Sequence, residues 1–436
     1  MTKKCSTVQK LPLLALAILS LEGGMAYGAG FGLEDGSVRG NVIPGQLMTR
    51  GDVPSAIFFN PAAITDLSGT QMEIGFTSIK PYADVTGINP YDGSYSRGYG
   101  RSSVWTLPSF YVTSQLSDSL WFGLGGFSRF GLGSEFDHTW AGRYNSIKAK
   151  IVTFDVNPNL AWKVNDRLSV ALGFSIRYFE IELGQMIDAA GIAGLRQYNN
   201  PAYSPFDVRQ QLKGDDIVPT VDFGLTYRLT DDLTFGFAYH SRCHLKVKGD
   251  AKWVVPAPVK ALAPMFFQNT DLHANAVLPD RFETGLAWDA TEQLTLSAGL
   301  TYTLWNLYDN LAIHLDDPML PGMDTLESRK GWNDTVRVSV GAEYDLNEAW
   351  SVRAGYTFDK SPINSQYVDY LVPGDDRHLL AAGVSWSKES WTIDLSCFYE
   401  IIEDFTVKAR PANGVLKGSF TGAKAYAVGL SVAKSF

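Results

Sequence analysis

The side chains with the most scope for catalysis in this sequence are its six histidines. His240 is followed by Ser241, and a serine activated by a histidine is a common nucleophile in lipases and esterases. In a β-strand successive side chains point to opposite faces, so these two groups could not act on one another. The Gly-x-Ser-x-Gly motif of such enzymes does not occur in the sequence. The sequence therefore predicts no catalytic residue, and a lipase or esterase stays an alternative.

Acidic pairs at 316–317 and 375–376 are the candidates for a metal site, because carboxylate oxygens bind calcium. Neither pair has the regular ligand spacing of an EF-hand loop, so solvated loop charges are the favoured interpretation. Cys243 and Cys397 are isolated residues without Cys-x-x-Cys spacing. Two separate thiols are favoured, and a disulfide between them stays open. We expect no metal and no cofactor.

The start of the chain has the pattern of an export signal. Three lysines in the first ten residues precede an apolar run at 11–21, and 26–28 offers small residues for a signal peptidase. We predict a signal peptide over residues 1–28, with cleavage before Ala29. No later stretch approaches the ~20 apolar residues that a membrane-spanning helix requires.

The charge balance of the chain is acidic. The 436 residues carry a formal charge of −9, and removal of the signal would leave 34 basic and 45 acidic side chains. Nucleic acids are bound through basic surfaces that neutralise phosphates. The composition therefore argues against a nucleic-acid partner.

From residue 70 onward, apolar residues alternate with small or polar residues, which predicts β-strands with one apolar face. In the segment 168–178 every even position is apolar or aromatic. We count fourteen such segments in the chain. They are 70–81, 103–115, 120–131, 150–164, 167–183, 217–229, 232–247, 275–289, 292–303, 331–345, 349–360, 376–388, 390–405 and 420–436.

The connections between these segments alternate in length. Tight turns such as 230–231 alternate with long stretches such as 184–216, 248–274 and 304–330. Bacterial outer-membrane barrels have even strand numbers, short turns at one end, long loops at the other and aromatic residues near the strand ends. A soluble β-sandwich does not require this asymmetry. We predict an all-β fold, a transmembrane antiparallel β-barrel of 14 strands over residues 70–436.

The same alternation points charged side chains of both signs into the barrel, which predicts ion-paired networks there. A wide aqueous pore would also have a polar wall, so a general porin stays an alternative. The side chains expected to point inward are Glu73, Asp155, Asn157, Asn159, Arg177, Asp222, Arg228, Arg281, Glu283, Arg337, Glu343, Arg353, Asp394 and Glu400.

Residues 29–69 do not alternate, and they contain many apolar side chains. As a disordered tail, the segment would expose these groups to water. As an independent domain it is too small, because chains of about 40 residues seldom fold alone without disulfides or metals. A barrel of 14 strands is wide enough for an internal plug. We therefore predict an N-terminal hatch inside the barrel over residues 29–69.

Five short motifs occur in a fixed order along the chain: Ala29-Gly30-Phe31, Phe59-Asn60-Pro61-Ala62, Ser128-Arg129-Phe130-Gly131-Leu132, Leu278-Pro279-Asp280 and Val372-Pro373-Gly374-Asp375-Asp376-Arg377. With these motifs, and over essentially the whole mature chain, the sequence resembles the FadL family (OMPP1/FadL/TodX) of outer-membrane transporters for long-chain fatty acids and other hydrophobic compounds. The resemblance implies a barrel with an N-terminal hatch and an inward kink in the third strand that opens a lateral door.

The resemblance also assigns residues to the hatch and the lateral opening, namely Asn60, Pro61 and Ala62 in the hatch and Phe130 and Gly131 at the kink. Five glycines between 123 and 133 agree with a bend there, because glycine in a strand often marks a bulge or bend. The side-chain amide of Asn60 offers both donors and an acceptor. We expect it to tie the hatch to the kink.

The function that the resemblance implies is passive uptake of a hydrophobic small molecule. The molecule would be captured at the outer loops, enter a lumen pocket and leave sideways through the kink. Fatty-acid transport would require a cation near the carboxylate, but Glu180 and Asn333 stand where basic residues are expected. Aromatic hydrocarbons therefore remain an open alternative. The residues expected to line the pocket are Ala29, Phe31, Arg177, Arg337, Phe266 and Phe267.

The expected location is the Gram-negative outer membrane, in which the protein would be a monomer. The expected partners are the hydrophobic substrate, the surrounding lipid and lipopolysaccharide, and the barrel assembly machinery. The C-terminal Phe436 is a residue that this machinery commonly reads in the family.

Overall fold

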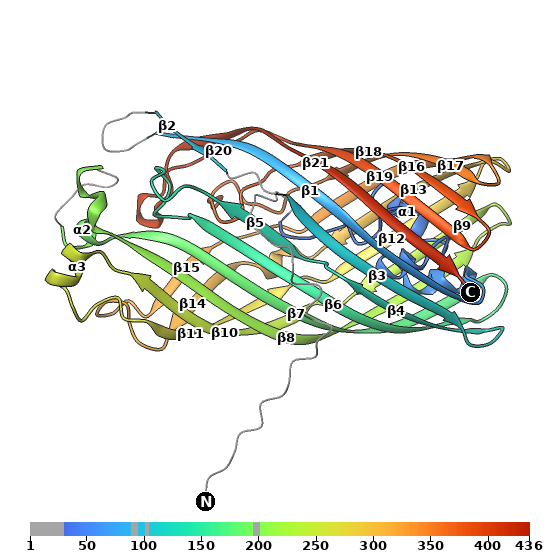
Figure 1. The fold of residues 1–436 in the computed structure, drawn as a ribbon, viewed down its shortest axis with the longest axis horizontal. Coiled ribbons are helices and arrows are strands. Elements are labelled where there is room, and N and C mark those ends of the chain that lie inside the picture. The colour runs from blue at the N-terminus through green and yellow to red at the C-terminus, as the bar shows by residue number, and fades with distance from the viewer. Residues whose placement is uncertain (1–29, 89–94, 101–103, 195–200) are drawn as a thin grey trace, which may run out of the picture.

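The computed structural model describes residues 30–88, 95–100, 104–194 and 201–436. The predicted signal peptide and Ala29 lie outside these ranges. The described strands form one antiparallel sheet of 21 strands, and seven wall positions are each broken into two of these strands. The sheet therefore closes as a barrel with 14 wall positions, as predicted (Figure 1). None of the helices in the described ranges is long and apolar enough to cross a membrane.

The long elements are strands of the wall, and the helices are short, with three to six residues each. The strands are β1 (Thr70–Ile88), β2 (Tyr95–Tyr99), β3 (Trp105–Gln115), β4 (Leu120–Phe127), β5 (Gly131–Glu135), β6 (Lys148–Lys163), β7 (Leu168–Asp188), β8 (Asp207–Arg228), β9 (Leu233–His240), β10 (Cys243–Val254), β11 (Thr270–Leu278), β12 (Arg281–Asp289), β13 (Leu294–Thr303), β14 (Asn310–Leu315), β15 (Thr325–Arg329), β16 (Thr335–Asn347), β17 (Trp350–Asp359), β18 (Arg377–Lys388), β19 (Trp391–Ile402), β20 (Phe405–Val407) and β21 (Gly418–Ser435). The helices are α1 (Pro44–Leu47), α2 (Ala189–Ile192), α3 (Ala257–Leu262) and the 3-10 helices η2 (Pro54–Phe58), η3 (Pro61–Asp66), η4 (Pro201–Phe206), η5 (Trp305–Leu307) and η6 (Pro411–Asn413).

The barrel closes where β1 pairs with β21, from Gln71 opposite Ser435 to Gly87 opposite Gly418. The wall is interrupted at its third position, where the strand is split into β4 and β5. There β4 pairs with β3 on one side and β6 on the other, whereas within the described ranges β5 pairs with β6 alone. Residues 128–130 separate β4 from β5. This interruption is the kink that the resemblance predicts.

The strands reach well beyond the predicted segments, because three stretches expected to be loops contain strand. β7 and β8 extend into 184–216, β10 and β11 extend into 248–274, and β14 and β15 lie within 304–330. In these extensions the alternation is inverted, since Leu245 and Val247 are buried while Lys246 is exposed. A wall above the membrane meets water outside, so its polar face turns outward.

Residues 30–67, which we call the hatch, lie inside the barrel at the end with the short turns, where Figure 1 shows α1 enclosed by the wall. Proline stands in the first turn of α1, η2 and η3, where its missing N–H is not required. Side chains of η2 and η3 pack with Tyr111, Trp121 and Phe127 of the wall in one buried apolar cluster. The hatch is thus part of the core of the barrel.

The hatch backbone approaches the wall at positions that have no side chain. A Cβ atom at Gly236 would lie 1.8 Å from Met48 O, and one at Gly355 would lie 1.9 Å from Val42 O. Glycines at such positions lie side by side on neighbouring strands, because Gly285 is paired with both Gly236 and Gly299 in the sheet. We give the name glycine belt to a set of wall glycines at which an added Cβ atom would meet backbone or side-chain atoms of the hatch. They are Gly224, Gly236, Gly285, Gly299, Gly341, Gly355, Gly383 and Gly429.

Nearly all charged side chains predicted to point inward are buried, as expected for a lumen packed with a hatch. Glu73 accepts a hydrogen bond from Ser55 N (2.8 Å), and Glu343 accepts one from Gln46 Nε2 (2.8 Å). Arg228 is the exception, because its side chain is exposed near the short-turn end. The predicted ion-paired network is therefore confirmed where it contacts the hatch.

Substitution of Gly355 by valine should loosen the hatch, because the added carbon atoms would overlap Val42 O. Overpacking of this kind costs about 1–3 kcal/mol. We expect the folded, fast-migrating band of Gly355→Val to disappear from gels at a lower heating temperature than that of the unaltered protein. Ala354→Val adds bulk on the outward face of the same strand and serves as the control. Equal midpoints for the two variants would contradict a close contact between hatch and wall.

Candidate functional site

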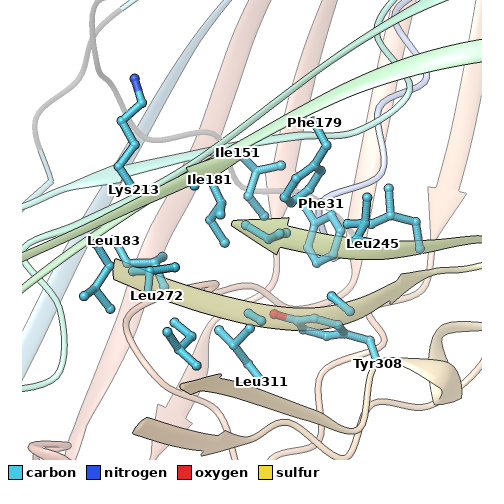
Figure 2. A pocket seen from close by; sticks show the side chains of 17 residues that line it. Phe31, Ile151, Phe179, Ile181, Leu183, Lys213, Leu245, Leu272, Tyr308 and Leu311 are labelled. Atoms are coloured by element: carbon cyan, nitrogen blue, oxygen red, sulfur yellow. The ribbon is translucent and has the colours of Figure 1, made fainter. Parts of the chain in front are cut away.

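A narrow pocket lined by apolar side chains, which we call the apolar cavity, lies in the upper lumen, above the hatch. Figure 2 shows its side chains converging from several strands of one wall and from Phe31 of the hatch. Its lining is almost entirely aliphatic and aromatic, which is typical of a site for a hydrophobic ligand. The lining residues are Phe31, Ile151, Phe179, Ile181, Leu183, Leu212, Lys213, Gly214, Leu245, Val247, Leu272, Ala274, Ala276, Leu278, Tyr308, Leu311 and Ile313.

Phe31 is the one lining residue predicted from the sequence, and the other residues of the lining were not predicted. They lie mainly on the strand extensions, where lumen-facing apolar residues alternate with charged ones. The run 244–248 reads His-Leu-Lys-Val-Lys, and the run 270–276 has the same period. The alternation of apolar with charged residues in these runs is the signal that would have predicted strands extending above the membrane with their apolar side chains in the lumen.

Phe31 forms the floor of the apolar cavity within a group of aromatic rings. Its ring centroid lies 4.9 Å from that of Trp305, 5.2 Å from Tyr308, 5.6 Å from Trp332 and 6.0 Å from Phe130. Most of these contacts are edge-to-face, which is a favourable geometry for aromatic rings. The first described residues of the hatch thus separate the cavity from the lumen beneath it.

No charged group of the lining points into the apolar cavity. Lys213 is the charged lining residue, and in Figure 2 its amino group is directed away from the other side chains. The lysine instead pairs with Glu180 at 3.2 Å. Burial raises the pKa of the Tyr308 phenol well above its usual range, and Asp369 adds to the rise, so the phenol stays neutral. The cavity can therefore hold apolar groups without a charged neighbour.

A wider space of about 780 Å³, which we call the vestibule, lies between the cavity and the loops. The two share Leu183, Leu212, Leu311 and Ile313, so the vestibule leads directly into the apolar cavity. Its remaining walls carry many polar groups. They include Asn145, Gln185, Asp188, Gln210, Glu327, Ser328, Arg329, Asp369, Arg410 and Asn413.

Two small adjoining cavities lie on the other side of Phe31, and we call them the exit chamber. They share Gly32, Glu34, Arg337 and Arg377. Gly131 lines the larger cavity, and Phe130 lines the smaller one with Trp305. The exit chamber therefore lies directly beside the kink.

The kink is held inward by the first residues of the hatch. Leu33 N donates a hydrogen bond to Arg129 O (2.8 Å), and Gly131 N donates one to Phe31 O (2.9 Å). The guanidinium group of Arg129 is buried between the rings of Phe58 and Phe127 and donates to Phe58 O (2.7 Å). Hatch backbone thus takes the place of the missing wall neighbour at 128–130.

The expectation that Asn60 ties the hatch to the kink is wrong. Its Nδ2 donates to Met48 O (2.7 Å) and to Leu225 O on β8 (2.9 Å), and its Oδ1 accepts from Ala62 N (3.0 Å). Gly224 allows this approach, because a Cβ atom there would lie 2.2 Å from Oδ1. Asn60 caps η3 and anchors the hatch to β8, whereas backbone hydrogen bonds and Arg129 hold the kink.

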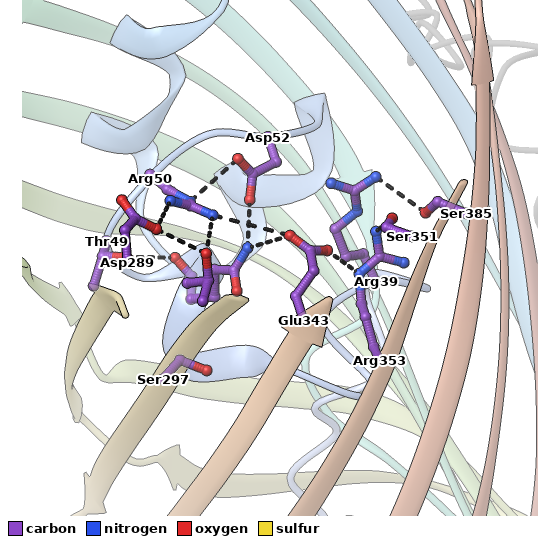
Figure 3. Close-up of polar contacts among 12 residues, drawn as sticks. Arg39, Thr49, Arg50, Asp52, Asp289, Ser297, Glu343, Ser351, Arg353 and Ser385 are labelled. Atoms are coloured by element: carbon purple, nitrogen blue, oxygen red, sulfur yellow. Dashed lines mark hydrogen bonds and ion pairs between the residues drawn. The ribbon is translucent and has the colours of Figure 1, made fainter. Parts of the chain in front are cut away.

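Ion pairs fasten the short-turn end of the hatch to the wall (Figure 3). Arg39 pairs with Asp394 at 3.2 Å, and Arg50 pairs with Asp289 at 2.8 Å. Arg353 of the wall pairs with both Asp394 and Glu343. These pairs hold residues 39–52 of the hatch in place, and we call this part the lower hatch.

The remaining predicted pocket residues lie apart from the apolar cavity. Arg177 is buried in a bidentate ion pair with Asp155 (2.7 and 2.8 Å), and Arg337 lines the exit chamber. Phe267 is buried and Phe266 partly exposed in the loop after α3, and neither lines the cavity. Only Phe31 among the described members of the predicted set lines the apolar cavity.

The candidate catalytic pair and the cysteines occupy structural positions. His240 Nδ1 lies 2.5 Å from Asp222 Oδ1, while the Ser241 hydroxyl accepts from Val221 N on the opposite face. Cys243 is buried and Cys397 is exposed, and both are free thiols. The favoured interpretation of two separate thiols is confirmed.

Comparisons with known proteins agree with this architecture. A family model described as outer membrane protein transport protein (OMPP1/FadL/TodX) matches residues 20–436. The chain is 24% identical over 422 residues to the long-chain fatty acid transport protein of Escherichia coli O6:H1, and the match covers 92% of each chain.

Two solved structures share the fold. A Pseudomonas aeruginosa FadL homologue aligns with a TM-score of 0.79 at 22% identity, covering 93% of this chain and 100% of the other. The Pseudomonas putida toluene transporter TodX aligns with a TM-score of 0.67 at 16% identity, covering 89% and 95%. The barrel architecture is thus shared with both of these solved structures.

The anchor between the hatch and β8 can be tested with Asn60→Ala. The change removes the donor for Met48 O and Leu225 O, and a buried group left without a partner costs about 1–3 kcal/mol. We expect faster hydrogen exchange in residues 58–67, measured by mass spectrometry, with the wall strands unchanged. Gln71→Ala is the control, because it removes an exposed side-chain hydrogen bond to Ser68 O. Unchanged exchange in η3 would exclude the anchor.

Proposed function

Because the chain belongs to the OMPP1/FadL/TodX family of outer-membrane transport proteins, we propose that it carries a hydrophobic small molecule from the vestibule through the apolar cavity to a lateral exit at the kink. The protein is an outer-membrane β-barrel transporter. The observation that carries the proposal is the order of three neighbouring spaces along the lumen. The vestibule shares lining residues with the apolar cavity, and Phe31 of that cavity packs against Phe130 and Trp305, which line the exit chamber.

The first step is the transfer of cargo from water to an apolar surface. Burial of apolar area is favourable by roughly 25 cal/mol per Å², so an alkyl chain or aromatic ring gains free energy on entering the cavity. The cavity has no inward charge to be desolvated by that step. A polar head group, where the cargo has one, can stay among the polar side chains of the vestibule.

The second step is release beside the kink, because the direct route to the short-turn end is filled. The lower hatch is seated on the glycine belt and fastened by Arg39 and Arg50. The first residues of the hatch are held by two backbone hydrogen bonds, by ring contacts and by the ion pair of Glu34 with Arg281. Displacement of Phe31 would join the apolar cavity to the exit chamber while the lower hatch stays in place.

The cargo has one of two chemistries that relatives in the family carry. The E. coli relative is a long-chain fatty acid transport protein, and the P. putida structure is a toluene transporter. The apolar lining of the cavity suits both the alkyl chain of a fatty acid and the ring of toluene. Because Arg177 is already paired with Asp155, and Lys213 with Glu180, neither offers a ready partner for a carboxylate inside the cavity.

The alternatives have less support. A general porin requires an open aqueous channel, whereas the hatch and its apolar cluster fill the lower lumen. A hydrolase requires a nucleophile beside a base, whereas His240 and Ser241 face opposite sides of the wall. Transport without bond making or breaking is therefore the proposed activity, and the protein is not proposed to be an enzyme.

A charge placed in the apolar cavity should block uptake. Leu311→Asp introduces a carboxylate into the lining, and an apolar ligand would have to desolvate it. We expect at least a tenfold lower initial rate of 1-decanol uptake by cells that depend on this protein. Leu346→Asp, at the exposed end of β16 on the short-turn side, is the control. Normal uptake by Leu311→Asp at normal abundance would exclude the cavity from the route.

A side chain at Gly131 should narrow the exit. A Cβ atom there would lie 2.7 Å from Leu33 Cδ1, so the obstruction grows with side-chain size. We expect Gly131→Leu to lower uptake strongly and Gly131→Ala only slightly, while binding of 1-decanol to the purified protein is unchanged. Equal uptake across the series would show that cargo does not leave beside the kink.

A further inference from the structure

The exit chamber differs from the apolar cavity in being lined by charged groups. Three arginines and four carboxylates face its two cavities. The arginines are Arg281, Arg337 and Arg377, and the carboxylates are Glu34, Asp35, Asp359 and Glu400. Cargo that leaves beside Gly131 must pass these charges.

Every arginine of the exit chamber is already engaged by a carboxylate. Arg281 Nη2 lies 2.6 Å from Glu34, and it also pairs with Glu283 at 2.7 Å. Arg337 pairs with Asp359 at 2.7 Å, which Arg377 shares. Arg377 also pairs with Glu400 at 3.3 Å. An incoming anion would have to displace one of these buried partners.

Asp35 is the remaining carboxylate of the chamber. Among the described residues its side chain makes no hydrogen bond and no ion pair within 4.0 Å, and the contact of Asp35 with Thr77 uses the backbone carbonyl. The charged groups that act on it are Arg337, Arg377, Glu34 and Glu400, and the two arginines are held by other acids. Its charge is therefore the excess charge of the exit chamber.

We propose that Asp35 is a specificity-determining residue that repels ionised carboxylates from the exit chamber and so favours uncharged hydrophobic cargo. This inference rests on the proposed lateral route and names the class of molecule that follows it. Two like charges repel one another more strongly in a confined space inside a protein than in bulk water. An alcohol or hydrocarbon of equal length meets no such repulsion. An acid would pass in its protonated form.

The experiment compares two cargo molecules that differ in charge. Initial uptake of labelled decanoate and labelled 1-decanol is measured at pH 8, where ordinary carboxylates are ionised, in cells that depend on this protein. We expect the ratio of decanoate to decanol uptake to rise at least threefold in Asp35→Asn, with decanol uptake within twofold of the original. Asp35→Glu, which keeps the charge, should leave the ratio unchanged.

Glu327→Gln is the matched control, because it removes a carboxylate from the vestibule and not from the exit chamber. An unchanged ratio in Asp35→Asn with normal decanol uptake would overturn the inference, and so would an equal rise in Glu327→Gln. Asp35→Ser is read in the same way if Asp35→Asn is poorly assembled. Failure of the proposed function would look different, since decanol uptake by the unaltered protein would then not exceed that of cells without it.

Discussion

The contact on which the structure depends is that between the hatch backbone and wall strands that carry glycine. Most of these positions leave no room for even a methyl group, because a Cβ atom would overlap hatch atoms, as at Gly236 and Gly355. Direct contact brings the polar backbone of the hatch within reach of wall donors and acceptors. A buried backbone group without a partner is costly. Glycine therefore makes it feasible for a plug to be buried inside a barrel.

The polar groups around the hatch complete what the glycine belt begins. Asn60 satisfies Met48 O and Leu225 O, and Arg129 satisfies Phe58 O. Ion pairs from Arg39 and Arg50 secure the short-turn end. Buried ion pairs add little net stability, but breaking one leaves an uncompensated charge. The lower hatch is thus held in one position by polar contacts, whereas the ring of Phe31 is held by contacts with other aromatic rings.

This division of the hatch accounts for the arrangement of the lumen. The apolar cavity ends at the ring of Phe31, and the charged exit chamber begins at Gly32. The aromatic rings around Phe31 therefore separate an environment that favours hydrocarbon from one lined by charged groups. Capture and selection of cargo can be altered separately, because Leu311 and Asp35 line different spaces.

The sequence by itself determined the barrel, its 14 wall positions, the hatch segment and the inward charges, because alternation with period two depends only on which face meets lipid. It also indicated the kink through glycines near Gly131. Tertiary structure alone decided that Asn60 anchors to β8 and that Arg177 is neutralised by Asp155, since these partners are far apart in the chain or offer several possible pairings. The apolar cavity was missed because its strands rise above the membrane, where the same alternation turns its apolar face inward.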